Sequence, residues 1–88
     1  MHYALIKKGI INMKSLTVRL NMMENVKEFV NIVSKYTYDV DLRTGRYVID
    51  AKSIMGIFSL DLTKPLVLEI HNDKCDDLIK DLKGFIVK

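Results

Sequence analysis

The sequence predicts one small α+β domain with the element order βαββαβα, in which helices cover one face of a sheet. The chain has 88 residues, of which 49% are hydrophobic and 28% charged, a composition typical of a packed domain. Segments in which apolar and polar residues alternate are interspersed with segments that carry apolar residues at helical spacing. This arrangement favours a sheet with one covered face.

Strands are predicted wherever apolar and polar residues alternate. Segment 15–20 reads SLTVRL, the pattern of a half-buried strand. Segments 38–43 and 46–50 alternate in the same way and flank a turn that contains Gly45, which predicts a β-hairpin. Segment 66–70 is a largely apolar run, so we expect it in the centre of the sheet.

Two helices are predicted between these strands. The first spans 25–36, where Asn25 is the expected N-cap and Glu28, three residues later, completes a capping box. The second is a short helix over 54–60 with Ser53 as its N-cap. Both carry apolar residues at the spacing of one buried helix face.

The last predicted helix follows the central strand. Asn72 and Asp73 are its expected caps, and Gly84 is expected to end it. Cys75, the only cysteine, falls on its apolar stripe, so we expect a buried and unreactive thiol. A lone cysteine excludes an internal disulfide and indicates a reducing compartment.

Composition also argues against several classes of function. The formal net charge is +3, and the charges are interleaved along the chain without an aromatic run beside them, so we expect no nucleic-acid binding. No apolar run approaches the roughly 18 residues of a membrane span, and the start lacks the pattern of a signal peptide. The expected location is the cytoplasm.

The leading residues differ from the rest of the chain. We divide the sequence into an N-terminal extension, 1–13, and a domain, 14–88. The first twelve residues hold two short apolar clusters and either form an extra strand or stay loose, while Met13 directly precedes the first strand and is a conceivable translation start. The oligomeric state is expected to be a monomer or a weak dimer.

One motif resembles a known family. Residues 52–60 read KSIMGIFSL and resemble the KSIMGxxSL segment of HPr, the histidine-containing phosphocarrier of the bacterial phosphoenolpyruvate-dependent sugar phosphotransferase system. Residues 34–36 (SKY) and 39–42 (DVDL) resemble the family's SKF and DINL at matching spacing, and the similarity covers 15–82. It implies an HPr-like open-faced β-sandwich, a four-stranded antiparallel sheet with three helices on one face.

The resemblance fails at the residues that carry phosphate in HPr. The family's histidine lies in a G-x-H-A-R-P segment before its first helix, and counting back from Ser34 places Met22 at the histidine, Glu24 at the arginine and Asn25 at the proline. A thioether offers no nucleophilic nitrogen, and a carboxylate repels the phosphate that an arginine would hold. We therefore predict no catalytic residue and no cofactor.

The short-helix motif carries the remaining expectations. In HPr of Gram-positive bacteria its serine is phosphorylated by a regulatory kinase, which makes Ser53 the expected regulatory site, although capping alone also explains a serine there. Exposed apolar residues of this helix bind partner proteins in HPr. Met55 is the expected anchor, and Ile54 and Phe58 are expected mainly in the core. The predicted partner-binding residues are therefore Lys52, Ile54, Met55 and Phe58.

These expectations describe an HPr-like protein that is no enzyme and acts by binding proteins of the phosphotransferase system or its regulation. Two alternatives stay open: a carrier that uses a displaced residue such as His71, and a structural domain that self-associates through Met1 to Asn12. His71, Cys75 and the nearby aspartates match no standard zinc spacing, so no metal site is predicted.

Overall fold

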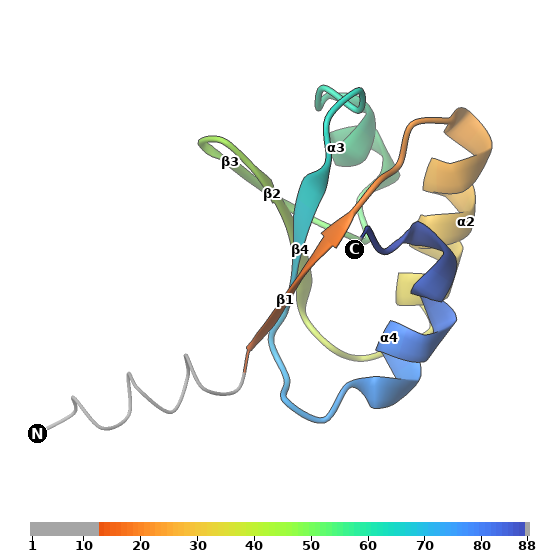
Figure 1. Cartoon of the computed structure of the whole chain (residues 1–88), viewed down its shortest axis with the longest axis vertical. Helices are drawn as coiled ribbons and strands as arrows, with labels where there is room; N and C mark the ends of the chain where they lie inside the picture. The colour runs from red at the N-terminus through yellow and green to blue at the C-terminus, as the bar shows by residue number, and fades with distance from the viewer. Residues whose placement is uncertain (1–12, 88) are drawn as a thin grey trace, which may run out of the picture.

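The computed structural model describes residues 13–87, and the expectations about Met1 to Asn12 lie outside that range. It contains a four-stranded antiparallel sheet in the order β1-β4-β2-β3, with the helices packed on one face (Figure 1). The predicted fold class is confirmed. The elements are β1 (Lys14–Val18), α2 (Met23–Val33), β2 (Val40–Thr44), β3 (Tyr47–Asp50), α3 (Ile54–Phe58), β4 (Leu66–Ile70), α4 (Asp76–Asp81) and the 3₁₀ helix η1 (Lys83–Phe85).

Strand β4 is central, as its apolar sequence predicts. It pairs with β1 on one side and β2 on the other, so Leu68 lies opposite both Leu16 and Leu42. Alternation along the strands sends these side chains to the helix-covered face, where the core forms. The buried apolar residues are Val18, Leu20, Val26, Phe29, Val33, Val40, Leu42, Ala51, Ile57, Leu66, Leu68, Ile70, Cys75, Leu78 and Leu82.

The β2–β3 hairpin projects from the body of the molecule (Figure 1). Its turn residues are Gly45 and Arg46, and Gly45 has a φ of 55° while no other described residue has a positive φ. Positive φ at the first central residue alone is the pattern of a type II′ turn, which matches the twist of a hairpin and favours glycine there.

The start of α2 differs from the prediction. The N-cap is Met22, with extended backbone angles (φ −132°, ψ 150°), and the amide of Val26 donates to the Met22 carbonyl at 3.1 Å. Asn25 is therefore already inside the helix, and its side-chain amide donates to the Asn21 side-chain oxygen at 3.4 Å. The predicted Asn25 cap is wrong, because apolar periodicity locates a helix face better than a helix end.

The start of α4 is also later than predicted. The side-chain oxygen of Asn72 accepts from the Lys74 amide at 2.8 Å, which makes a local turn instead of a helix cap. The helix follows Cys75, whose side chain is fully buried as expected, and burial raises the pKa of that thiol. The helix ends at Asp81, and Gly84 lies in the following 3₁₀ turn.

Two tyrosines attach α4 to the loop between α2 and β2. Tyr36 and Tyr38 stack with ring centroids 5.7 Å apart, and the Tyr38 hydroxyl donates to the Asp77 carboxylate at 3.0 Å. The Tyr36 hydroxyl donates to the Asp81 carboxylate, and this bond raises the pKa of Tyr36 to about 12. Contacts between residues this far apart in sequence fix α4 against the loop between α2 and β2.

Candidate protein-docking site

The start of α2 exposes two methionine side chains. Met22 and Met23 are 55% and 59% exposed, and Met22 provides no side-chain hydrogen bond to the helix. Because the first intrahelical donor is Val26, the amides of Met23, Glu24 and Asn25 have no intrahelical acceptor. Those amides attract anions, but the Glu24 carboxylate in the first turn repels anions.

Helix α3 begins as predicted. Ser53 is its N-cap, and the Ser53 hydroxyl accepts from the Gly56 amide at 3.3 Å. A β-carbon on Gly56 would lie 3.2 Å from that hydroxyl oxygen and 3.5 Å from a methyl carbon of Ile49. The glycine thus leaves room for the serine to reach the helix amide. Ser53 is also exposed, so its hydroxyl is accessible from solvent.

Lys52 does not extend freely beside Ser53. Its ammonium donates to the Tyr36 carbonyl at 2.8 Å, which ties the start of α3 to the loop after α2. Its backbone amide donates to the Asp50 carboxylate at 2.8 Å. The side chain is half-buried, so this lysine has a structural contact in addition to any contact with a partner.

The apolar residues of α3 divide between core and surface. Ile57 is fully buried and Ile54 is half-buried against the core, whereas Met55 is 77% exposed. Phe58 is 39% exposed, so the expectation that it belongs to the core is wrong. Successive helix residues are rotated by about 100°. With Ile57 facing the core, the next residue turns away from it.

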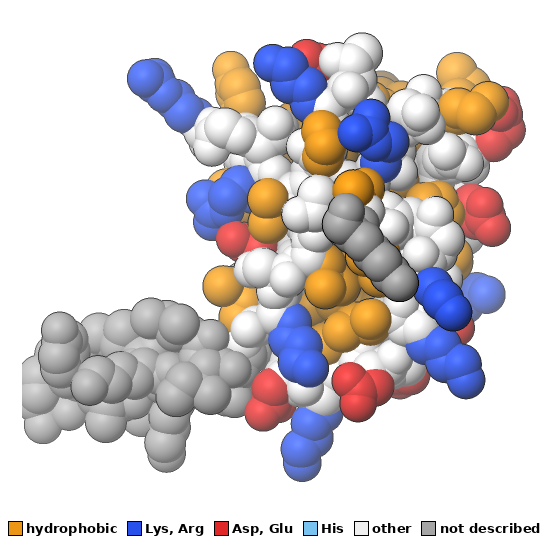
Figure 2. Space-filling model, in the orientation of Figure 1, with side chains coloured by type: hydrophobic (Ala, Val, Ile, Leu, Met, Phe, Trp, Pro, Cys, Tyr) orange, Lys and Arg blue, Asp and Glu red, His pale blue; other side chains and the backbone are white. Residues whose placement is uncertain are grey.

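The start of α2 and helix α3 lie at the same end of the molecule, and the two helices are in contact (Figure 1). Hydrophobic side chains are exposed over the start of α2 (Figure 2). We call Met22, Met23, Met55 and Phe58 the apolar docking surface. Methionine side chains are flexible and polarisable, and they adapt to differently shaped apolar partners.

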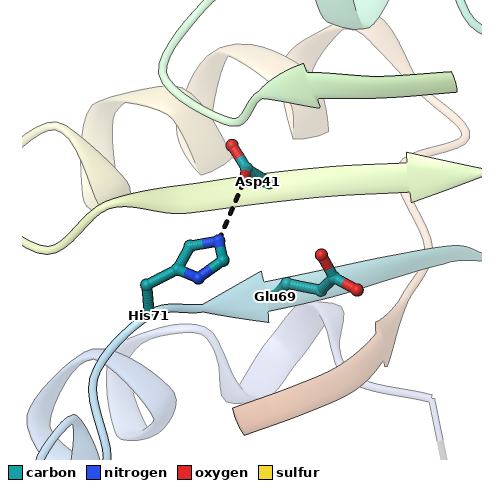
Figure 3. A group of neighbouring side chains, drawn as sticks. All are labelled: Asp41, Glu69 and His71. Atoms are coloured by element: carbon teal, nitrogen blue, oxygen red, sulfur yellow. Dashed lines mark hydrogen bonds and ion pairs between the residues drawn. The ribbon is translucent and has the colours of Figure 1, made fainter. Parts of the chain in front are cut away.

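A second cluster lies on the face of the sheet without helices. Asp41 of β2, Glu69 of β4 and His71 lie near one another there, with potential ligand atoms within 4.8 Å, and His71 points to Asp41 whereas Glu69 is directed away from this pair (Figure 3). His71 Nε2 is 2.8 Å from an Asp41 oxygen, and Arg43 holds both oxygens of Glu69 at 2.9 and 3.2 Å. The bond with Glu69 raises the pKa of the Arg43 guanidinium.

The hydrogen bonds and ion pairs of this cluster account for the closeness of these side chains without a metal ion. A cation could use Glu69 only after the Arg43 pair opened, since that pair engages both carboxylate oxygens. The cluster was not foreseen, because its members come from two strands whose register the sequence does not reveal. One feature of the sequence could have indicated part of the cluster: Glu69 and His71 are two residues apart, so in an extended segment they share one face.

The surroundings of His71 also bear on the alternative that this protein is a phosphocarrier that uses His71 as its displaced phosphate acceptor. The end of β4 that leads to His71 and the start of α2 lie at opposite ends of the molecule (Figure 1). A shallow hollow of about 500 Å³ beside His71 is lined by Asp39, Asp41 and Asp50 as well as Lys52. Such an acidic setting disfavours a phosphate dianion, so the structure gives the His71 alternative no support. The other histidine, His2, lies outside the described residues.

Comparison with known proteins identifies the family. A family model described as the PTS HPr component phosphorylation site matches residues 23–86. The chain belongs to the HPr family. The match begins one residue after Met22, the position counted as that of the carrier histidine.

Solved structures of HPr proteins agree with this assignment. HPr-C-His from Thermoanaerobacter tengcongensis is 26% identical, with a TM-score of 0.64 over 81% of this chain and 88% of the other. Phosphocarrier protein HPr from Bacillus anthracis str. Ames is 18% identical, with a TM-score of 0.65 over 85% and 98%, and it supports the shared fold alone. A search of curated protein sequences found no match.

The family gives the coarse function. HPr proteins are phosphocarriers of the phosphotransferase system that interact with its other proteins, and they are not themselves catalysts. Within residues 13–87, no helix combines the length and apolar character needed to cross a membrane.

Proposed function

We propose that this HPr-family protein is a non-catalytic regulatory module that binds proteins of the phosphotransferase system or its regulators. The observation that carries the proposal is Met22 at the N-cap of α2, where the family resemblance expects the carrier histidine. The single cysteine is buried and unpaired, which supports a cytoplasmic location.

The chemistry at this position opposes phosphoryl transfer. A phosphocarrier needs a nucleophilic nitrogen, and the Met22 thioether supplies none. Glu24, which replaces the arginine of the family motif, places a negative charge in the first turn, close to where a phosphate would lie. The free helix amides remain, but they are unable to form a covalent bond with phosphorus. Binding is therefore the activity that this end of the protein retains.

The apolar docking surface supports a protein partner. Met55 is the most exposed of its residues, and Phe58 adds an aromatic side chain on the same short helix. Large apolar groups in the centre of an interface contribute most of the binding energy in many complexes. The replacement of histidine by methionine extends this apolar surface to the start of α2.

The first test asks whether the protein accepts phosphate as a carrier. We expect its intact mass to stay unchanged after incubation with phosphoenolpyruvate and the first enzyme of the phosphotransferase system. A phosphocarrier HPr treated in parallel should gain about 80 Da in an acid-labile form. An acid-labile gain of the same size on this protein would contradict the proposal.

We also propose that phosphorylation of Ser53 regulates partner binding. The hydroxyl is exposed and already accepts from the Gly56 amide, so a phosphate there would meet a backbone donor. Treatment with HPr kinase and ATP should add about 80 Da that survives acid. Ser53→Ala removes the acceptor and should show no gain, while Ser59→Ala at the other end of α3 is the matched control and should gain normally. An unmodified wild-type protein would refute the regulatory site and leave the binding role standing.

A further inference from the structure

The two edge strands of the sheet, β1 and β3, differ in whether another segment pairs with their outer side. The C-terminal segment pairs with the end of the β1 edge: the Val87 amide donates to the Thr17 carbonyl at 2.8 Å, and Ile86 forms a bridge with Val18. Strand β3 pairs with β2 alone, and no other segment of residues 13–87 pairs with its outer edge. An uncovered edge offers free backbone donors and acceptors to another strand.

Strand β3 carries only part of the usual protection of a free edge, because it is short and ends in the charged Asp50 but contains no proline. Its centre, Tyr47-Val48-Ile49, holds no charged residue and no proline, and Tyr47 and Val48 are 68% and 46% exposed. In a hairpin with a two-residue turn, the closing pair Thr44 and Tyr47 exchange both hydrogen bonds, and the bonding residues then alternate. The amide and carbonyl of Val48 therefore point away from β2, toward the open edge.

We propose that two copies of this protein associate through β3, paired antiparallel with Val48 of one copy opposite the partner's Val48. In this arrangement the outward amide of each Val48 donates to the carbonyl of the other. The two sheets then continue as one sheet across a two-fold axis. Such an isologous contact uses the same surface on both copies.

The side chains that flank Val48 fit this register. Arg46 lies opposite the partner's Asp50, and the two-fold axis creates this pair of opposite charges twice. Within residues 13–87, Arg46 has no ion-pair partner, and Asp50 uses one oxygen to accept from the Lys52 amide. A shift of two residues in one direction would instead place Arg46 opposite the partner's Lys52, which repels it.

The helix-side residues of β3 fit the same register. Tyr47 lies opposite the partner's Ile49, and this apolar pair also forms twice. Both residues line a hollow of about 440 Å³ between the hairpin and the segment after α3, so the pair covers a partly apolar surface. In a parallel pairing, Arg46 of one copy would lie beside the partner's Arg46, and these like charges would repel each other. Charge and shape thus select the antiparallel self-pairing.

The contact is small, because β3 has four residues. Short interfaces lie below the size of stable dimers and dissociate readily. Sedimentation velocity should show a monomer at about 10 μM and a rising dimer fraction toward about 1 mM. Over the same range, hydrogen exchange at the Val48 amide should slow, while exchange at the Ile49 amide, which already bonds to β2, should change little.

Three variants locate the interface. Val48→Pro deletes the outward amide without removing a bond to β2, so it should abolish the dimer and keep the fold. Arg46→Glu places its carboxylate opposite that of the partner's Asp50, so it should also abolish the dimer and keep the fold. Arg46→Glu combined with Asp50→Lys restores opposite charges and should restore association. Lys83→Glu makes the same charge change beside the opposite, β1 edge, so it is the matched control and should dimerise like the wild type.

The proposal would be overturned by a wild-type protein that stays monomeric at about 1 mM. It would equally be overturned if Val48→Pro and Arg46→Glu both dimerised normally. Loss of the dimer on removal of residues 1–12, with no effect of Arg46→Glu, would assign association to the leading segment instead. Circular dichroism of each variant checks that its fold is intact.

Discussion

The double variant Met22→His and Glu24→Arg should accept about one acid-labile phosphate from phosphoenolpyruvate and the first enzyme of the phosphotransferase system, whereas the wild type should accept none. The imidazole would supply the missing nucleophile at the N-cap of α2. The guanidinium would replace a repelling carboxylate with a cation able to hold the phosphate. The free amides of the first helical turn are already in place to receive it.

Single substitutions separate the two contributions. Met22→His alone should accept phosphate more slowly, because Glu24 still opposes the incoming charge. Glu24→Arg alone should gain no acid-labile mass, since it provides no nucleophile. Intact mass spectrometry before and after mild acid treatment measures all three variants. A double variant that stays unmodified would mean that this end of the protein has also lost the surface that the phosphorylating enzyme recognises.

Truncation of Leu68 to alanine should cost about 2–5 kcal/mol of the free energy of unfolding. Leu68 is fully buried in the central strand and lies opposite apolar residues of both neighbouring strands. A domain of this size has about 5–10 kcal/mol of stability in total. At a denaturant dependence of about 1 kcal/mol/M, the urea midpoint should fall by about 2 M or more.

Val67→Ala is the matched control for Leu68→Ala. Val67 precedes Leu68 in β4 but points to the face without helices, where it is 37% exposed. Its truncation should cost less than about 1 kcal/mol. If both variants shifted the urea midpoint equally, the assignment of one covered and one open face would be wrong.

Much of the fold could be predicted from local patterns. Alternation over 15–20 and the apolar run over 66–70 predicted two strands, and apolar spacing predicted the helix that buries Val26 and Phe29. Ser53 was correctly predicted as a cap, because its helix is short and has one suitable residue before it. Asn25 and Asn72 were wrongly predicted as caps. Each lies near a helix start, but the backbone placed their side chains in other hydrogen bonds.

The candidate docking site was predicted in part. Residue identity placed Met22 at the position that the resemblance gives to the carrier histidine, and it placed Met55 off the buried stripe, where the structure shows it 77% exposed. Ile54, Ile57 and Phe58 were assigned to one buried face of a helix that extends to residue 60. The observed helix ends at Phe58, where Ile57 is buried as predicted but Phe58 is 39% exposed. The last residue of a short helix can therefore follow the apolar spacing and still lie at the surface.

By itself, the sequence determined the element types, the family resemblance and the absence of an imidazole at Met22, because each depends on residue identity or on local spacing. The tertiary structure decided which distant residues meet. Strand register joins Asp41 with His71, the C-terminal segment pairs with the end of the β1 edge, and no segment of residues 13–87 pairs with the outer edge of β3. Register and edge coverage result from packing between segments far apart along the chain, so no local pattern encodes them.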